Sequence, residues 1–216
     1  MHQKPDGDAM GSTLGLYHFL KALGHDAVVI SPTNWADFLD WMPGIDTVID
    51  FEKKKDAALT RISDADYLFC LDFNTLSRTK NMEQPLANAK GARILIDHHQ
   101  QPQTEVFAYG VSDTSKSSTC EMVYDIILGA GHGAHISMDV ATCLYTGLMT
   151  DTGSFRFPAT TASVHRMIAH LKDLGLDHTV VHSHIFDNSL EKLSSNPSKL
   201  PFIRKKLAML MKKYYL

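Results

Sequence analysis

The chain has 216 residues, of which 44% are hydrophobic and 21% charged, and its formal net charge is −3. This length and composition predict a globular protein with one sizeable core. Met1 is followed by polar residues and no run of eighteen apolar residues occurs, which argues against secretion and membrane spanning and favours the cytoplasm. The three cysteines form no CxxC pair, so neither a disulfide framework nor a zinc knuckle is indicated.

Charge divides the chain into two parts. Residues 1–191 contain 14 basic and 24 acidic residues, a net charge of −10, whereas residues 192–216 contain seven basic and no acidic residues. We therefore predict a compact domain over 1–191 and a basic tail or truncated linker over 192–216. An acidic body of this kind does not suit duplex-specific nucleic-acid binding, although a small cationic pocket within it is compatible with the charge.

Short β-rich runs alternate with helical stretches, which is typical of an α/β fold with parallel strands. Apolar spacing predicts a first helix over 9–24, with Gly24 at its C-terminal end. In chain order, the further predicted elements are a strand at 27–30, a short helix at 34–44, a strand at 47–50, a helix at 52–65, strands at 66–74 and 92–99, and helices at 118–131, 137–155, 161–175 and 177–186.

Aspartate and histidine residues gather where the predicted elements begin or end. The segments concerned are HQKPDGD (2–8), LDFN (71–74), DHH (97–99) and TDTGSF (150–155). One aspartate in such a place is usually a cap or turn residue, but four such segments indicate a common site. Because ligands of open α/β sheets bind beyond the carboxyl ends of the strands, we expect the segments to meet there.

The first segment predicts a tight turn before a helix. Gly7 separates Asp6 from Asp8 and would allow the backbone to aim both carboxylates at neighbouring points. Gly11 and Ser12 would then open a helix whose N-terminal amides favour an anion.

These segments, together with SSTCEMVYDII (117–127) and GLMTDTGSFRF (147–157), resemble the DHH phosphoesterase family, named after the triplet that stands here as Asp97, His98 and His99. The resemblance covers most of residues 2–190 and is closest to the branch of oligoribonuclease and pAp (3'-phosphoadenosine 5'-phosphate) phosphatase enzymes. It implies a parallel-sheet α/β domain with helices on both faces.

The resemblance also implies two departures. Family members have a central strand that leads into the first histidine, and only Met1 precedes His2 here, so we expect this strand to be missing and His2 to be frayed. A smaller DHH-associated domain follows in the family, and this chain stops before one, so we expect a catalytic lobe with weak substrate affinity.

A two-metal centre follows from the resemblance. Oxygen and imidazole ligands without thiolate favour Mn²⁺, with Mg²⁺, Co²⁺ or iron as alternatives, and two ions that share a carboxylate suit phosphoryl chemistry. Carried over by position, one metal ion would take His2, Asp6 and Asp72, and the other Asp8, Asp72, His98 and Asp151.

By the same resemblance, His99 would contact the scissile phosphate or assist the leaving oxygen, and Arg156 would clamp the phosphate with its planar guanidinium. We therefore expect a manganese-dependent phosphoesterase acting on short single-stranded oligonucleotides or pAp. A cyclic-dinucleotide phosphodiesterase, an inorganic pyrophosphatase and a weakly active nucleotide-binding remnant stay open as alternatives. A homodimer stays open too.

Overall fold

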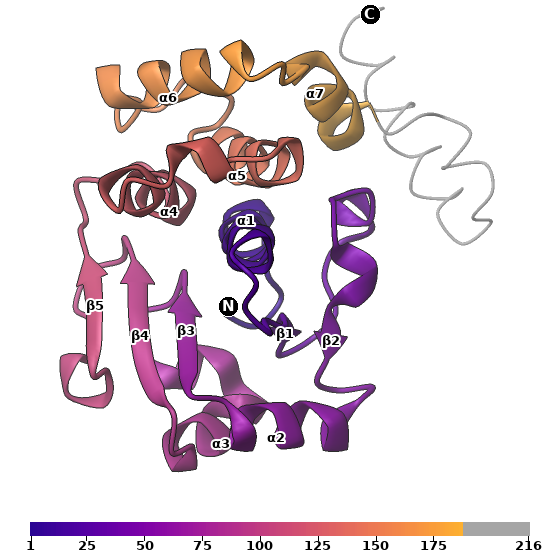
Figure 1. Ribbon diagram of the computed structural model, residues 1–216, viewed down its shortest axis with the longest axis vertical. Coiled ribbons are helices and arrows are strands. Elements are labelled where there is room, and N and C mark those ends of the chain that lie inside the picture. The colour runs from indigo at the N-terminus through magenta and orange to yellow at the C-terminus, as the bar shows by residue number, and fades with distance from the viewer. Residues whose placement is uncertain (188–216) are drawn as a thin grey trace, which may run out of the picture. The chain divides into compact units, whose positions relative to one another are not determined.

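The computed structural model describes residues 1–187. The predicted tail at 192–216 and the predicted boundary at 191 lie outside these residues. Parallel strands and helices of residues 1–178 form one unit (Figure 1), which confirms the predicted α/β class. No helix among residues 1–187 is long and apolar enough to cross a bilayer.

The strands form two separate parallel sheets. β1 (Ile30–Ser31) pairs with β2 (Ile49–Asp50), and β3 (Tyr67–Leu71), β4 (Ala92–Asp97) and β5 (Tyr109–Ser112) pair in the order β3-β4-β5. Three of the predicted strands contain β2, β3 and β4, whereas β1 begins at the last residue of the strand predicted for 27–30. β5 was not predicted, although the apolar residues 106–109 lead into it, and all four of its residues are exposed.

A cavity of about 750 Å³ lies between β1 and β3, and its lining includes Met1, Ile30, Tyr67 and Phe69. Among the described residues no strand lies between β1 and β3. On this face of β3, Tyr67 is 61% and Phe69 36% exposed. Coverage of β3 by helices is therefore incomplete on one face.

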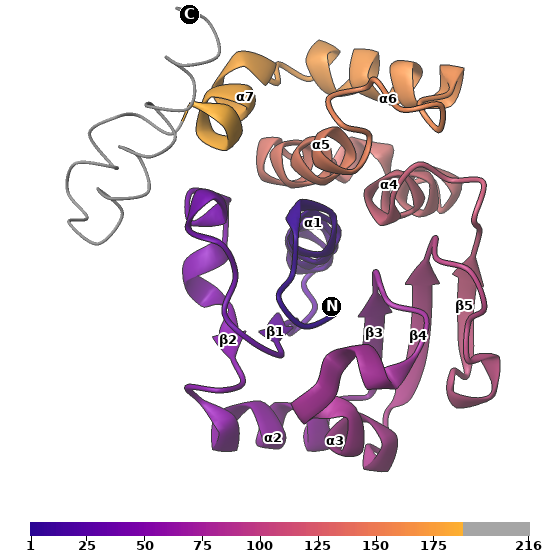
Figure 2. The ribbon, with the colours of Figure 1, turned by 180° about the vertical axis from the view of Figure 1, so that it is seen from behind.

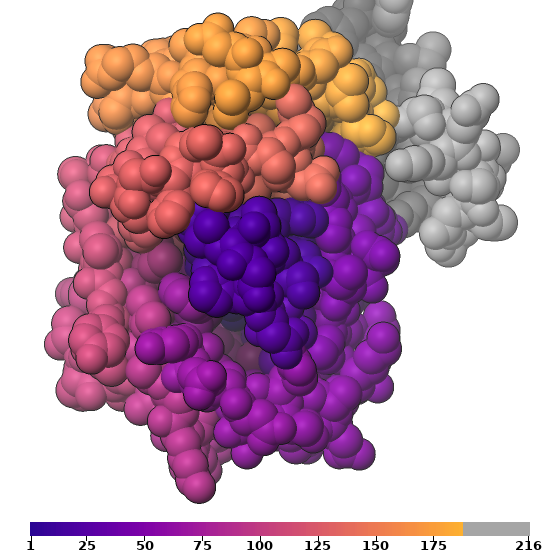
Figure 3. Space-filling model, in the orientation of Figure 1, coloured from indigo at the N-terminus to yellow at the C-terminus, as the bar shows by residue number. Residues whose placement is uncertain are grey.

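The helices stand on two sides of the strands (Figures 1 and 2). Two of them pack beside β3, where Ala58, Ile62 and Leu86 join Cys70 and Phe73 in a buried cluster; they are α2 (Lys55–Asp64) and α3 (Glu83–Asn88). Three others pack together toward the carboxyl ends of β3 and β4, namely α1 (Gly7–Ala22), α4 (Thr119–Gly129) and α5 (Met138–Asp151). The indigo surface of α1 lies directly against α5 in the space-filling view (Figure 3).

The remaining elements agree only partly with prediction. α6 (Ala162–Asp173) packs on α4 and α5, and α7 (His178–Phe186) falls within the last predicted helix. The helix predicted for 34–44 is wrong: short 3₁₀ helices occur at Asp37–Leu39 and Ile45–Thr47, on either side of Pro43 and of Gly44, whose φ is +81°. Helical structure also occurs where none is predicted, as a 3₁₀ helix at Leu76–Met82 followed by α3.

Helix α1 begins earlier than predicted. Asp6 is its N-cap, since its Oδ1 accepts hydrogen bonds from the backbone N–H groups of Asp8 (3.1 Å) and Ala9 (3.0 Å). The prediction that Gly11 and Ser12 open the helix is therefore wrong. Gly7 is the first helical residue, and its lack of a side chain is needed because a Cβ there would lie 2.3 Å from Thr150 Oγ1.

Gly11 provides a test of how closely α1 packs on α5. A Cβ at Gly11 would lie 2.5 Å from the carbonyl oxygen of Cys143, a backbone atom that cannot rotate away. We expect Gly11→Ala to lower the free energy of unfolding by about 1–3 kcal/mol. The matched control is Gly129→Ala at the end of α4, where a Cβ meets nothing within 4 Å and a gain of up to about 1 kcal/mol is expected. Urea unfolding measures both, and equal effects would contradict the close approach.

Candidate metal centre

Segments far apart in the sequence meet beyond the carboxyl ends of β3 and β4. Asp72 follows β3 directly, and His98 and His99 follow β4. Asp6 and Asp8 stand at the start of α1, and Asp151 is the last residue of α5. The four aspartate and histidine segments therefore meet at this edge of the sheet, as predicted.

The first group of donor atoms surrounds His2. Its Nε2 lies 3.3 Å from Asp72 Oδ2 and 3.7 Å from Asp6 Oδ2. His2 is only 8% exposed, and neighbouring residues hold the segment, since Gln3 N–H donates to the carbonyl of Arg78 and Lys4 N–H to Thr33 Oγ1. The expectation of a frayed His2 is thus not met.

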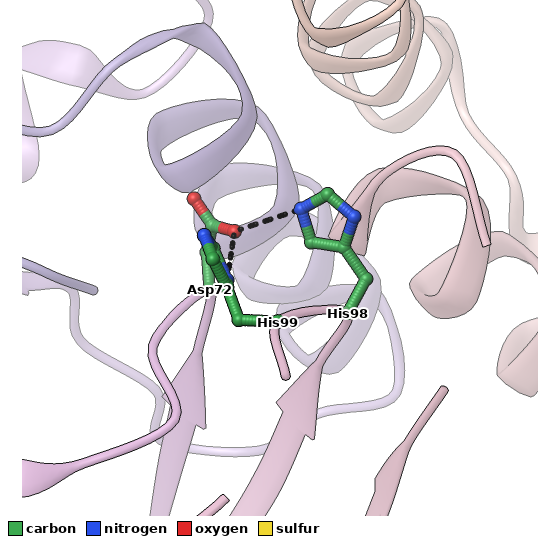
Figure 4. A group of neighbouring side chains, drawn as sticks. All are labelled: Asp72, His98 and His99. Carbon is green, nitrogen blue, oxygen red and sulfur yellow. Dashed lines mark ion pairs between the residues drawn. The ribbon is translucent and has the colours of Figure 1, made fainter. Parts of the chain in front are cut away.

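The second group surrounds His98. Its Nε2 lies 3.5 Å from Asp151 Oδ2, 3.6 Å from Asp72 Oδ1 and 3.8 Å from Asp8 Oδ2. Asp72 therefore turns one carboxylate oxygen toward each group. Figure 4 shows this carboxylate beside the rings of His98 and His99, whose Nδ1 lies 3.7 Å from the same Oδ1.

The donor atoms suit divalent metal ions. One donor atom per residue lies within 4.8 Å of the others in three overlapping sets: His2 with Asp6 and Asp72, Asp8 with His98 and Asp151, and Asp72 with His98 and His99. All of these donors are carboxylate oxygens or imidazole nitrogens. Neighbouring ligands of an octahedral ion, each about 2.0–2.1 Å from it, are about 3 Å apart. Separations of 3.3–3.8 Å between the imidazole nitrogens and the carboxylate oxygens therefore need only small movements to close on an ion.

Asp8 is held by the first turn of α4. Its Oδ2 accepts a hydrogen bond from Thr119 N–H (2.7 Å) and its Oδ1 from Cys120 N–H (2.9 Å), where the helix presents its positive end. Burial, with the nearby charges of Asp72 and Asp151, still raises the pKa of Asp8 well above its usual value. A bound dication would replace the proton that this arrangement favours.

His2 and His98, two of the histidines that face Asp72, have their pKa values shifted by the opposite balance of effects. Burial by itself would lower the pKa of His2 and of His98, but contact with aspartates outweighs it and raises both pKa values to about 9. The same contacts overcome the effect of burial on Asp72 and lower its pKa. Asp151 has its pKa raised to about 6, because burial and the charge of Asp72 outweigh the attraction of His98.

The backbone at Asp72 is strained. Its φ is +61°, in the left-handed region that non-glycine residues rarely adopt. Thr119 Oγ1 donates a hydrogen bond to Asp72 Oδ1 (3.1 Å) and helps to hold the side chain in place. Strain of this kind occurs at functional sites, where the surrounding structure holds it.

Asp97 has a place that the sequence analysis did not assign. It is completely buried, and its Oδ1 lies 2.7 Å from His99 Nδ1 while its Oδ2 accepts the backbone N–H of His99 (3.1 Å). A carboxylate at this position favours the proton on Nδ1 and orients the ring. The sequence did carry a signal for this contact: Asp97 directly follows the apolar residues of a predicted strand and stands two positions before His99.

Arg156 follows the last residue of α5, Asp151, by five positions. It is exposed in the turn that follows α5, and its Nε donates a hydrogen bond to the carbonyl of Gly153 (2.7 Å). The turn contains Ser154 and Phe155 with φ values of +58° and +65°. The phosphate-clamping role of Arg156 stays a prediction.

The sequence model of the DHH family N-terminal domain matches residues 1–148. This chain belongs to the DHH family. It is 37% identical over 176 residues to a bifunctional oligoribonuclease and PAP phosphatase NrnA of Thermus thermophilus, a match that covers 81% of this chain and 49% of the relative. A protein of the same name from Bacillus subtilis is 27% identical over 199 residues, covering 90% of this chain and 58% of the relative.

Solved structures agree with this membership. The crystal structure of an exopolyphosphatase-related protein from Bacteroides fragilis has a TM-score of 0.88 and 35% identity, covering 96% of the DHH chain and 59% of that protein. A putative family II inorganic pyrophosphatase of Methanococcus jannaschii shares the fold, with a TM-score of 0.57 and 16% identity, over 85% of this chain and 58% of that one. The DHH chain spans about half the length of the curated relatives it matches.

Proposed function

We propose that this DHH chain is a metal-dependent phosphoesterase that holds two divalent ions and hydrolyses short oligonucleotides or pAp. The observation that carries the proposal is the carboxylate of Asp72, which offers one oxygen to the His2 group and the other to the His98 group. One carboxylate shared between two donor groups suits the short spacing between ions that two-metal phosphoryl chemistry uses.

Substrate class is supported by the relatives. The Thermus thermophilus and Bacillus subtilis relatives are named as oligoribonuclease and PAP phosphatase, and the first is 37% identical to this chain. Carboxylate and imidazole donors without thiolate suit Mn²⁺. We therefore propose Mn²⁺ as the preferred ion, with Mg²⁺ or Co²⁺ as substitutes.

When bound, the two ions would supply an acidified water and neutralise charge on the phosphate. The side chains of the protein do the remaining work. With the Nδ1 proton of His99 held by Asp97, Nε2 of the doubly protonated ring would give its proton to the leaving oxygen, which leaves the ring neutral with its remaining proton on Nδ1. Arg156 would bind a non-bridging phosphate oxygen from the exposed turn after α5.

A substrate panel tests the proposal. The purified chain is assayed with Mn²⁺ on a ribodinucleotide, pAp, a cyclic dinucleotide and inorganic pyrophosphate, with Asp8→Asn as the inactive control. We expect turnover of the dinucleotide or pAp that Asp8→Asn abolishes. Turnover of the cyclic dinucleotide or of pyrophosphate alone would replace the proposed substrate class, and tight Mn²⁺ binding without any turnover would indicate a nucleotide-binding remnant.

Asp97 gives a prediction about His99. In Asp97→Asn the partner of Nδ1 loses its charge, so the ring is held less firmly in the required tautomer. We expect kcat to fall by about 100-fold, within the range of a lost acid or base, while Mn²⁺ affinity is retained. Steady-state kinetics with pAp and calorimetric titration of Mn²⁺ measure the two quantities. A loss of Mn²⁺ affinity without a change in kcat at saturating metal would contradict the role given to Asp97.

A further inference from the structure

Glu121 is a buried carboxylate in the first turn of α4 that belongs to neither donor group. It is 2% exposed. Its Oε2 accepts hydrogen bonds from the N–H and the hydroxyl of Ser117 (both 2.8 Å), and its Oε1 accepts one from the hydroxyl of Ser163 on α6 (2.7 Å). Lys116 Nζ lies 3.6 Å from the same Oε1. Burying a carboxylate charge costs free energy unless it has hydrogen-bonding or charged partners. The buried Glu121 therefore depends on Ser117, Ser163 and Lys116 staying where they are.

Glu121 bonds to a short segment of chain that also contacts the donor groups. The carbonyl of Lys116 lies 3.4 Å from His98 Nδ1, on the side of the ring opposite the donor Nε2. Two positions after Ser117, Thr119 donates its N–H to Asp8 and its hydroxyl to Asp72. The segment from Lys116 to Thr119 therefore contacts three proposed ligands, and Glu121 is bonded to the middle of that segment.

Helix capping alone does not explain the geometry. Ser118 is the N-cap, its side chain accepts the N–H of Glu121 (3.1 Å), and Ser118 and Glu121 have the spacing of a capping box. In a capping box the glutamate returns to the N-cap N–H, whereas here it reaches one residue further, to Ser117, and across to Ser163 on another helix. Glu121 thus ties the segment before α4 to α6.

We propose that Glu121 is a positioning residue of the metal centre, which fixes the Lys116 to Thr119 segment and through it orients His98, Asp8 and Asp72. This inference rests on the proposed function, because it supposes that those three residues bind metal. Hydrogen-bonding partners outside the ligand set typically contribute about 10–100-fold to metal affinity.

Calorimetric titration of the full chain with Mn²⁺ tests the inference, beside thermal unfolding of the same variants in EDTA. We expect Glu121→Ala to weaken Mn²⁺ binding by about 10–100-fold. Glu121→Gln should recover most of the affinity, since its amide oxygen can accept the Ser117 N–H while its amide nitrogen donates to Ser163. Glu121→Asp keeps the charge but is one methylene shorter, so it should lose affinity.

The matched control is Asp125→Asn. Asp125 is on the same helix and pairs with Nζ of the same lysine, Lys116, at 2.6 Å, but it is exposed, and this contact is to the lysine side chain, whereas the backbone carbonyl of Lys116 is the atom near His98. Its affinity for Mn²⁺ should equal that of the wild type.

Three outcomes decide the matter. If the wild type binds Mn²⁺, Asp8→Asn loses binding and both Glu121→Ala and Glu121→Asp bind as the wild type does, the positioning role is wrong while the metal centre stands. Variants that unfold at lower temperature without losing affinity would likewise reduce Glu121 to a structural residue. A wild type that binds no Mn²⁺ would overturn the metal centre and this inference with it. Should Glu121→Ala not fold, the Glu121→Asp and Glu121→Gln pair decides.

Discussion

Replacing Asp72 with asparagine is expected to remove Mn²⁺ binding at both donor groups and to reduce hydrolysis to background. The neutral amide keeps the shape of the side chain but offers one weak oxygen donor where the carboxylate offers two charged ones. Asp72 faces His2 at 3.3 Å and His98 at 3.6 Å, so both groups lose a donor together. We expect affinity to fall by more than the about 10–100-fold that a partner outside the ligand set contributes.

The measurement for Asp72→Asn is Mn²⁺ titration combined with turnover of pAp or a dinucleotide. Circular dichroism should show an α/β spectrum like that of the wild type. Asp46→Asn serves as a matched control, because Asp46 is exposed in a 3₁₀ helix of the same chain and outside both groups. If Asp72→Asn hydrolyses substrate at the wild-type rate, the shared-carboxylate interpretation fails.

Manganese is expected to stabilise the protein, and to do so more strongly as pH rises. An ion at 100 times its Kd adds about 2.7 kcal/mol per site to the free energy of unfolding. For a chain of this size each kcal/mol moves Tm by about 2–4 °C, so one site gives a shift of about 5–11 °C. Differential scanning fluorimetry with Mn²⁺ and with EDTA measures this shift.

The pH dependence follows from the pKa values of the donor residues. The pKa of His2 and of His98 is raised to about 9, so the stability from their protonated forms is complete below about pH 6.5 and is lost as pH rises through 9. The pKa of Asp151 is raised to about 6, so its contribution is complete below about pH 3.8 and is lost as pH rises through 6. The metal-free protein should therefore become less stable between pH 6 and 9.

Metal binding has the opposite dependence. An ion must displace the protons on these side chains, so its apparent affinity increases as they are lost. The difference between the Tm with Mn²⁺ and the Tm with EDTA should grow from pH 6 to pH 8.5. A difference that stays constant or shrinks over this range would show that the titrating groups and the metal do not share a site.

The sequence alone determined the fold class, and its resemblance to the DHH family supplied the expected residues of the site. The alternation of short apolar runs and amphipathic stretches predicts parallel strands and helices because burial favours period-two and period-3.6 patterns. The aspartates and histidines could be assigned to one edge because parallel strands end on the same side of a sheet. His2, Asp6, Asp8, Asp72, His98 and Asp151 were named as ligands by resemblance to the DHH family, and the structure brings their donor atoms into overlapping clusters.

Prediction from local sequence patterns failed for three elements of the fold. β5 was missed although the apolar residues 106–109 lead into it; all four of its residues are exposed, and it pairs with β4. The helix predicted for 34–44 gives way to irregular structure around Pro43 and Gly44. The start of α1 was misplaced because Asp6 serves as a cap as well as a candidate ligand.

Only the tertiary structure decided how the candidate ligands are held. The amides of Thr119 and Cys120 bind Asp8 across more than 110 positions of sequence, and Glu121 bonds to Ser163 across 42. Local sequence carries no record of such pairings, because they depend on which helix ends a fold brings within hydrogen-bonding distance. A sequence pattern can therefore name the atoms that a metal would touch, while three-dimensional packing selects the groups that orient those atoms.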